Sequence, residues 1–380
     1  MTALSTRYSV EETASCIVRS AVPEDNEALI ALAAACPMRG PLTLRIDRAP
    51  DFFALNRLEG DRWSVGVAER NGVIVGCIGN SERRVWLDGS PHLTGYTGDL
   101  KVHPEHRDGI VADELTRFGV RANAELPRGT PTLITVLAGN RAMERRLAGP
   151  RGLPRFDRIA TVRTHSITIM WKRRLPRGLS LRVQRATWKD LDEMIALWNR
   201  VAPQRHFAPV LDADSLSDWI RKAPGLDISS YRLARDSHGE LLGFVALWDQ
   251  SAFKELRVDA YSARMAAARH CFNAVATAIG GEKLPAPGMA LRHLTALHIC
   301  VPGDRPDVLR AIAIESHNSL RHAGYSFINF GLDVEDPLTA AFDGLFAQPT
   351  DINACVSPPF APFNGNVRSA LPFHYEIALV

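Results

Sequence analysis

The stretch "YTGDLKVHPEHRDGIVADEL", Tyr96 to Leu115, has the pattern of a strand, a charged bend that contains a proline, and the start of a helix. From Val111 to Phe118, apolar residues recur every three or four positions, which is the spacing of a helix that buries one face. We therefore predict a strand over 94–102 and a helix over 110–125.

The bend between this strand and this helix has the residues of an anion site. The first turn of a helix carries unpaired backbone N–H groups and a partial positive charge. Gly109 lets a ligand approach these groups, and Arg107 adds a charged side chain that can donate two hydrogen bonds to one anion. The bend thus predicts a diphosphate site, and the alternative is an ordinary strand–helix connection with a solvated arginine.

Composition limits the class of protein. The 380 residues exceed what one hydrophobic core usually serves, so we expect two domains. A net charge of +3 is too small to indicate a nucleic-acid partner, and no apolar run is long enough to cross a membrane. The six cysteines are scattered without a C-x-x-C pair. We expect a cytoplasmic protein with reduced thiols and no metal.

Two parts of the chain resemble each other. "VRSAVPEDNEALIAL", from Val18, aligns without gaps with "VQRATWKDLDEMIAL", from Val183. Further along, residues 66–79 and 232–246 both have the pattern of a β-hairpin with a turn at Asn-Gly or His-Gly. A shared order of strand, helix and hairpin indicates a duplicated domain. The alternative is that two unrelated segments, each beginning with a strand and a helix, are similar by chance.

The segment "KRRLPRGLS", 172–180, is rich in charge, proline and glycine, and it separates the two copies. We predict one domain over 1–174 with the ligand site, and another over 178–380. In the first, strands and helices alternate as in a mixed α/β (α+β) sheet. Its central strands are predicted over 63–70, 73–79, 83–87 and 94–102.

This order of elements resembles the GNAT superfamily of N-acetyltransferases, and the whole chain resembles a tandem GNAT protein. The family's coenzyme A motif, Arg/Gln-x-x-Gly-x-Gly/Ala, follows a strand that ends hydrophobic-x-Val-x-Pro. Here "LKVHP" (100–104) precedes Arg107, and Ala112 falls on the last small position, with Ile110 in place of the first glycine. In "ITVLAGNRAMERRL", Asn140 matches an asparagine that contacts the coenzyme, and Met143 replaces an alanine.

The resemblance implies an acetyl-CoA site and no metal, with acetyl-CoA acting as acyl donor. The strand over 94–102 would separate from the next strand, and the pantetheine arm would pair with the backbone of Leu100 and Val102 in that gap. The implied coenzyme contacts are Leu100, Lys101, Val102, Arg107, Asp108, Gly109, Ile110, Val111, Ala112 and Asn140.

The catalytic residues are less clear from the motif. Many family members carry a Glu and a Tyr where this chain has Gly98 and Leu147. Asp99, Tyr96 and His103 are therefore the candidates for moving a proton. Each has a structural alternative. Asp99 can be a structural carboxylate, Tyr96 a packed ring, and His103 a histidine of a surface loop. Proton transfer to bulk water, with rate enhancement from positioning, is a further alternative.

The acceptor is expected at residues 36–53, "CPMRGPLTLRIDRAPDFF", where the family places its acceptor loops. A long loop that mixes charges and aromatic rings suits a binding lid, and the alternative is a packed loop that caps the domain. We predict Met38, Arg39 and Arg45 as substrate contacts. The arginines favour an acceptor with a carboxylate or a phosphate.

The second copy has lost the features of the coenzyme site. Leu297–Ile299 in "LTALHICVPGDRPDVLRAI" corresponds to Leu100–Val102, but Pro306 follows and removes a backbone donor. We predict a degenerate domain that is structural or shapes the acceptor site. The final "FHYEIALV" (373–380) alternates like a closing strand.

Three functions remain after these observations. The first is an acetyl-CoA-dependent N-acyltransferase that acts by direct attack of a primary amine of a small molecule or peptide. The second is an aminoacyl-tRNA-dependent transferase, because such proteins also pair two GNAT-like domains. The third is a non-catalytic CoA-binding module. We expect a monomer or homodimer with no membrane partner, and a nucleic-acid partner is not expected.

Overall fold

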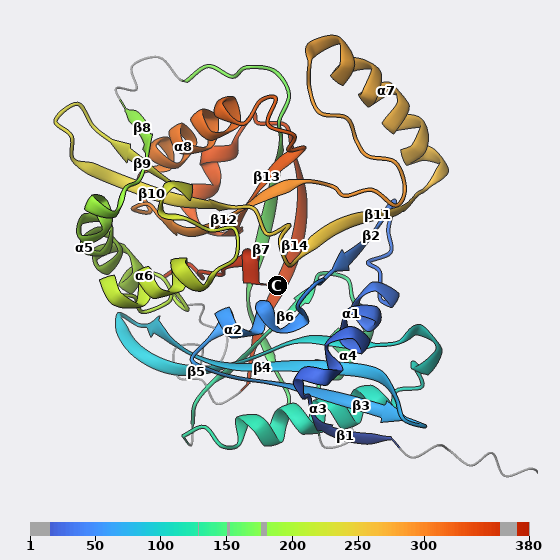
Figure 1. The fold of residues 1–380 in the computed structure, drawn as a ribbon. Helices are drawn as coiled ribbons and strands as arrows, with labels where there is room; N and C mark the ends of the chain where they lie inside the picture. Colours follow the sequence, from blue (N-terminus) through green and yellow to red (C-terminus); the bar gives the residue numbers. More distant parts are fainter. Residues whose placement is uncertain (1–15, 128, 150–152, 176–180, 358–370, 380) are drawn as a thin grey trace, which may run out of the picture.

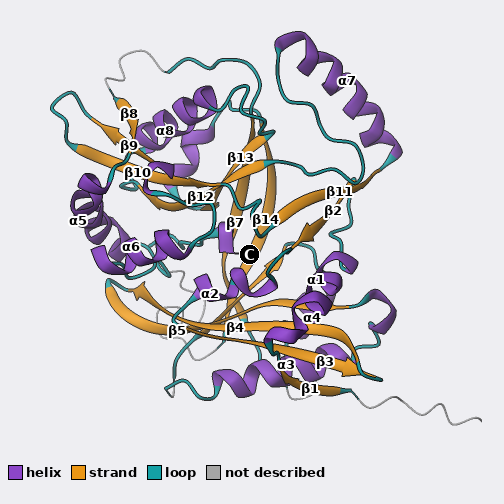
Figure 2. Ribbon diagram, viewed as in Figure 1, coloured by secondary structure: helices purple, strands orange, loops and turns teal. Residues whose placement is uncertain are grey.

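Twelve strands form one sheet in the computed structural model, which describes residues 16–127, 129–149, 153–175, 181–357 and 371–379. The order across the sheet is β1-β3-β4-β5-β6-β14-β7-β13-β12-β10-β9-β8 (Figure 1). A separate pair, β2 and β11, forms a second small sheet (Figure 2). The mixed α/β sheet predicted from the sequence is thus confirmed.

The first half contributes β1 (Ile17–Ser20), α1 (Asn26–Ala35), β2 (Leu42–Asp47), α2 (Asn56–Glu59), β3 (Arg62–Arg70), β4 (Val73–Leu87), β5 (Ser90–Val102), α3 (Ile110–Asn123), β6 (Thr132–Leu137), α4 (Arg141–Leu147) and β7 (Asp157–Thr168). The second half contributes β8 (Arg182–Arg185), α5 (Leu191–Val201), α6 (Ala213–Lys222), β9 (Tyr231–Arg235), β10 (Leu241–Trp248), β11 (Glu255–Tyr261), α7 (Ala263–Ile279), β12 (His293–Cys300), α8 (Pro306–Ser319), β13 (Phe327–Asp333) and β14 (Ala347–Val356).

The two halves repeat one pattern of strand pairing. In the first, β1, β3, β4 and β5 are antiparallel and β6 runs parallel to β5. In the second, β8, β9, β10 and β12 are antiparallel and β13 runs parallel to β12. A parallel neighbour needs a crossover, which α3 and α8 supply. The duplication inferred from the sequence is therefore visible in the topology.

The register corrects the sequence alignment of the two copies. Each copy has a bulge with one left-handed residue, Asp99 in β5 (φ 54°) and His298 in β12 (φ 50°). These residues correspond, so Leu100 matches Ile299 rather than Leu297. Alternating apolar patterns in a strand tolerate such a slip, because a shift of two residues keeps each side chain on its face.

The halves exchange strands at the centre of the sheet. β7 is the last strand of the first half yet pairs with β13, and β14 is the last strand of the second half yet pairs with β6. β7 and β14 also pair with each other over ten residue pairs. The sheet is thus continuous between the two halves, and the proposed boundary between 174 and 178 remains a prediction about the chain.

Three local predictions are wrong for physical reasons. The strands predicted over 73–79 and 83–87 are one strand, β4, because the polar residues between them point into the interior. The segment 36–53 is not only a loop, because β2 pairs with β11 across the halves. Within "FHYEIALV", residues 373–376 form no strand and Ile377–Leu379 form a 3-10 turn.

Helices cover both faces of the first half of the sheet. Leu29 and Leu32 of α1 pack with Val67 on one face, and Val111 and Leu115 of α3 pack against the other. In the described residues, no helix is long and apolar enough to span a membrane.

Candidate functional site

Strands β5 and β6 separate where the sequence predicts a gap. They pair only from Gly95 to Thr97, and β6 then continues beside β14. The bulge at Asp99 turns β5 away, and its last residues, to Val102, pair with β4 alone among the described strands. Peptide groups on the free side of these residues can therefore pair with an extended ligand.

Two arginines, one from the loop after β5 and one from β3, bind groups of this loop. Arg107 is exposed, and its Nε donates to the carbonyl oxygen of Val102 at 3.1 Å. Asp108 accepts a hydrogen bond from the backbone N–H of Ile110 at 2.9 Å and forms an ion pair with Arg70 at 2.6 Å. The start of α3 is thus capped by the chain's own carboxylate. Sequence reasoning missed Arg70, which comes from β3.

Glycine has a conformational role at the start of α3. Gly109 precedes the helix with φ 93°, a backbone conformation that is energetically unfavourable for any residue with a side chain. A Cβ added to Gly109 would have no other atom within 4 Å. Space for a ligand therefore exists beside this residue. Asn140 precedes α4, and its side chain caps this helix by accepting from the N–H of Met143 at 3.3 Å.

A buried group of charges lies behind the gap. Arg48, of which 2% is exposed, donates to Asp99 at 3.0 Å and to the carbonyl oxygen of Phe52 at 2.6 Å. Lys101 forms a second ion pair with Asp99. Burial raises the pKa of the Asp99 carboxyl, but Lys101 and Arg48 outweigh it and hold that pKa well below its usual range. Asp99 is therefore an ionised anchor and a weak base.

Glu59, at the end of α2, is the better base. Its side chain is buried, and burial raises the pKa of its carboxyl to about 7, against the opposing charge of Arg83. Lys254 comes from the second half, and burial together with nearby Arg48 lowers the pKa of its ammonium to about 7. Each of these two groups is within electrostatic range of the other, and Lys254 Nζ donates to the carbonyl oxygen of Ala378 at 3.3 Å.

Gly60 explains how Glu59 is placed. A Cβ at Gly60 would lie 1.9 Å from the carbonyl oxygen of Glu82 in β4, so only glycine lets the backbone pass this strand. The chain therefore leaves α2 in close contact with the sheet, and Glu59 is held in the interior. In the sequence "FFALNRLEG" (52–60), the signal is an acidic residue and a glycine that follow a mostly apolar segment.

Three hydroxyl groups meet where β5 and β6 separate. The Tyr96 hydroxyl lies 3.0 Å from Thr135 Oγ1 and 2.9 Å from the Tyr375 hydroxyl. Thr135 Oγ1 and the Tyr375 hydroxyl are 2.9 Å apart. Burial, followed by the charge of Glu59, raises the pKa of the Tyr96 phenol. Arg83 lies 4.7 Å from the centre of the Tyr96 ring. Tyr96 is therefore a protonated phenol whose hydroxyl contacts two other hydroxyl groups.

Residues 371–379, here called the central segment, lie between the two halves (Figure 1). Strands β12 and β13 also separate, after Thr295, and the backbone N–H of His298 donates to the Glu376 carboxylate at 3.1 Å. An added Cβ at Gly331 would lie 2.4 Å from Ile377. The central segment thus occupies the second half's equivalent of the gap, which agrees with a degenerate second copy.

Other predicted residues lie apart from the buried charges. His103 follows β5 beside the loop, where its Nδ1 accepts from the N–H of Glu105 at 3.4 Å. Arg45 pairs with Asp259 of β11 at 3.3 Å, and Met38 pairs through its backbone with Leu44. Arg39 is exposed. The described residues hold no group of His, Cys, Asp and Glu that could bind a metal ion.

Comparison with known proteins now becomes informative. No family model matches the chain, and no curated protein matches it by sequence. Among solved structures, Saccharomyces cerevisiae N-myristoyltransferase with bound myristoyl-CoA is similar over 92% of this chain and 85% of its own, at 11% identity and a TM-score of 0.59. A GCN5-related N-acetyltransferase from Sphaerobacter thermophilus is similar over 90% and 95%, at 12% identity and 0.55.

A third similar structure contains a glucosamine N-acetyltransferase region of a fungal multi-domain β-N-acetylglucosaminidase, with 14% identity and a TM-score of 0.59. This chain covers 38% of that protein. Identities this low establish the fold alone. Together with the repeated strand order, they confirm that the chain has a tandem GNAT fold, as the motifs of the sequence had implied.

Proposed function

We propose that the chain is an N-acyltransferase that moves an acetyl group from acetyl-CoA to a primary amine of a small molecule or peptide. One observation carries the proposal: the separated end of β5 leads to an arginine-bearing loop, and buried Glu59 is within electrostatic range of Asp99 in the same strand. An acyl-CoA needs the first feature, and an amine that must lose a proton needs the second. The GNAT fold of the solved structures supports this reading.

The donor would lie along β5. Its pantetheine amides would pair with the backbone of Leu100 and Val102, and its diphosphate would meet Arg107 and the N–H groups of residues 109–112. Lys101 would contribute its backbone only, because its side chain pairs with Asp99. The Asp108 carboxylate would move aside when the diphosphate binds, since like charges repel. Asn140 would contact the coenzyme from the start of α4.

The reaction would proceed by direct attack. The amine loses a proton to Glu59 and its nitrogen forms a bond with the thioester carbonyl carbon, while a backbone N–H of β5, assigned to Val102, stabilises the developing oxyanion. The carbon–sulfur bond then breaks, and the thiolate takes a proton from the Tyr96 hydroxyl. The proton that Glu59 took from the amine would then return to the Tyr96 phenolate through solvent, which restores both groups, and Thr135 and Tyr375 would hydrogen-bond the Tyr96 oxygen meanwhile. Asp99 would hold Lys101 and Arg48 in place.

The acceptor would enter where residues 36–39 lie beside the end of β5. The thiol of Cys36 donates to the carbonyl oxygen of Val102 at 3.3 Å, which places this segment next to the gap. Met38 and Arg39 are therefore proposed as acceptor contacts. Arg45 would act indirectly by tying β2 to β11. The unpaired thiols of the chain agree with a cytoplasmic setting.

A transfer assay tests this function. The purified chain is mixed with acetyl-, hexanoyl- or myristoyl-CoA and with amines of three classes, namely polyamines, amino sugars and peptide N-termini. We expect release of free coenzyme A thiol that depends on both acetyl-CoA and an amine, with a product one acetyl group heavier than the amine.

Other outcomes would contradict the proposal in distinct ways. Faster transfer from myristoyl-CoA would overturn the acetyl assignment and keep the acyltransferase. Binding of acyl-CoA without transfer to any amine would indicate a non-catalytic module. Transfer only from aminoacyl-tRNA would establish the alternative donor.

A further inference from the structure

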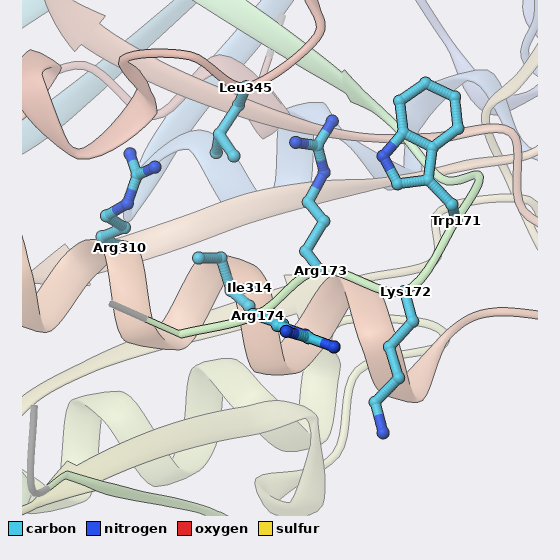
Figure 3. A pocket seen from close by; sticks show the side chains of 7 residues that line it. All are labelled: Trp171, Lys172, Arg173, Arg174, Arg310, Ile314 and Leu345. Atoms are coloured by element: carbon cyan, nitrogen blue, oxygen red, sulfur yellow. The ribbon is translucent and has the colours of Figure 1, made fainter. Parts of the chain in front are cut away.

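A pocket of about 260 Å³ lies between the segment that follows β7 and helix α8, and none of its lining residues belongs to the buried charges of the proposed active site. Residues 171–174, which follow β7, form one wall. Arg310 and Ile314 of α8 and Leu345 form the others (Figure 3). The side chains of Arg173 and Arg310 extend on either side of Leu345, and those of Lys172 and Arg174 extend in a different direction.

This pocket concentrates positive charge. Four of its residues are cationic, namely Lys172, Arg173, Arg174 and Arg310. Within the described part of the chain, none of them forms an ion pair with a carboxylate. By contrast, Arg163 in β7 forms an ion pair with Asp351 at 2.8 Å. Unpaired like charges that share one pocket raise the local concentration of anions.

The Arg173 backbone is fixed by an unusual contact with α8. Its N–H donates to Asn318 Oδ1 at 2.9 Å, and its carbonyl oxygen accepts from Asn318 Nδ2 at 2.9 Å. This double hydrogen bond sets the place from which the guanidinium extends. The guanidinium also lies 5.8 Å from the centre of the Trp171 ring.

The position of the Arg173 guanidinium in this pocket is energetically unfavourable for its charged form. Its Nε is buried and has no hydrogen-bond partner among the described residues. Burial, and then the charge of Arg310, lowers the pKa of Arg173. Arg310 is itself fixed, because it donates to the carbonyl oxygens of Ala341 at 2.9 Å and Asp343 at 2.8 Å. An anion between the two guanidinium groups would remove this cost.

We propose that this pocket binds the phosphate group of a small molecule, with Arg173 and Arg310 as its principal contacts. Guanidinium groups match the oxygens of a phosphate in pairs, and two of them balance a dianion. A volume of about 260 Å³, with the apolar side chains of Ile314 and Leu345 on its walls, is enough for a small phosphorylated molecule. A net charge of +3 on the whole chain does not indicate a broad surface for a polyanion.

Calorimetry on the full chain tests the proposal, with inorganic phosphate and glycerol phosphate as probes and chloride at equal ionic strength as the reference. We expect one saturable site per chain. Arg173→Gln should weaken binding roughly 10- to 100-fold, the range for losing a charged hydrogen bond. Arg264→Gln, at an exposed position of α7, is the matched control and should leave affinity unchanged.

The source of the phosphate follows from the two probes. Tighter binding of glycerol phosphate indicates a phosphomonoester, and equal binding indicates inorganic phosphate. Either result supports the site. If Arg173→Gln does not fold, Arg173→Lys, which keeps the charge but loses the paired N–H donors of the guanidinium, should still weaken binding several-fold.

Three results would overturn the proposal. The first is no saturable binding of either probe at millimolar concentration. The second is equal weakening by the Arg264 control. The third is tighter binding of a single-stranded RNA that depends on Arg173, which would make the pocket part of a polyanion surface.

Discussion

Replacing Glu59 with glutamine is expected to lower kcat for amine acylation roughly 100- to 10 000-fold, the usual contribution of a positioned general base. The amide keeps the size of the side chain but cannot accept the amine proton. Affinity for acetyl-CoA should change little, because the proposed donor contacts lie along β5 and at the start of α3. Steady-state kinetics and a binding titration on the same variant separate the two effects.

The pH profile gives a second readout. Burial raises the pKa of Glu59 to about 7, and the base is its deprotonated form. The wild-type kcat should therefore rise with pH through about 7 and level off above it, and this limb should vanish in Glu59→Gln. Glu105→Gln, at an exposed position beside His106, is the control and should keep the profile. A Glu59→Gln enzyme with wild-type kcat would remove Glu59 from the mechanism.

The same shift predicts a cost in stability. The carboxyl binds its proton more tightly in the folded state, so its contribution to stability is complete below about pH 4.5 and is lost as pH rises through about 7. Above that pH, Glu59→Gln should be more stable than wild type, by at most about 3 kcal/mol. Loss of activity with a gain in stability would identify a functional site rather than a structural one.

Replacing Arg48 with methionine is expected to lower the free energy of unfolding by about 3 kcal/mol. The change leaves the Asp99 carboxylate, of which 17% is exposed, with Lys101 alone and removes a donor from the carbonyl oxygen of Phe52. Methionine fills much of the same volume, so lost packing contributes little. Urea unfolding at pH 7, with the m-value compared, measures the effect.

A matched surface pair controls for the loss of an arginine. Arg57 pairs with Asp51, and both side chains are more than a third exposed. Arg57→Met should cost at most about 1 kcal/mol, because water solvates the remaining charge. An equal loss in the two variants would show that the Arg48–Asp99 pair is not a buried anchor.

The local parts of the fold could be predicted from the sequence. The helix after β5 follows from spaced apolar residues, and the hairpins at Asn71-Gly72 and His238-Gly239 follow from turn residues between strand patterns. The duplication could be found because both patterns recur in the second half. Such signals lie within about 20 residues, where chain geometry alone limits the structure.

Long-range features left no such signal. The exchange of β7 and β14 between halves depends on which strand edge each one meets, and the same alternating sequence fits either edge. Likewise, Asn80 and Ser81 interrupt the apolar pattern of β4 and suggest a break, but they are buried polar residues within one continuous strand. Polar residues that face the interior mark the candidate site only once its other walls are known.

The candidate site was found in part. The β5 segment and Arg107 were expected from the resemblance to the GNAT motif, and their roles remain proposals. Arg48, Glu59 and Lys254 were missed because they come from separate segments and are charged residues that sequence patterns assign to the surface. Only the structure shows that burial shifts the pKa values of Glu59 and Lys254 toward neutrality.

A calorimetric titration with acetyl-CoA, on the wild-type chain and on Arg107→Ala, tests the central claim most directly. The proposed function predicts one site per chain, weakened by about 1.5–3 kcal/mol in the variant through loss of a charged contact with the diphosphate. Two sites per chain would mean that the central segment does not close the second half's gap. No binding at high protein concentration would contradict the acyl-CoA site itself.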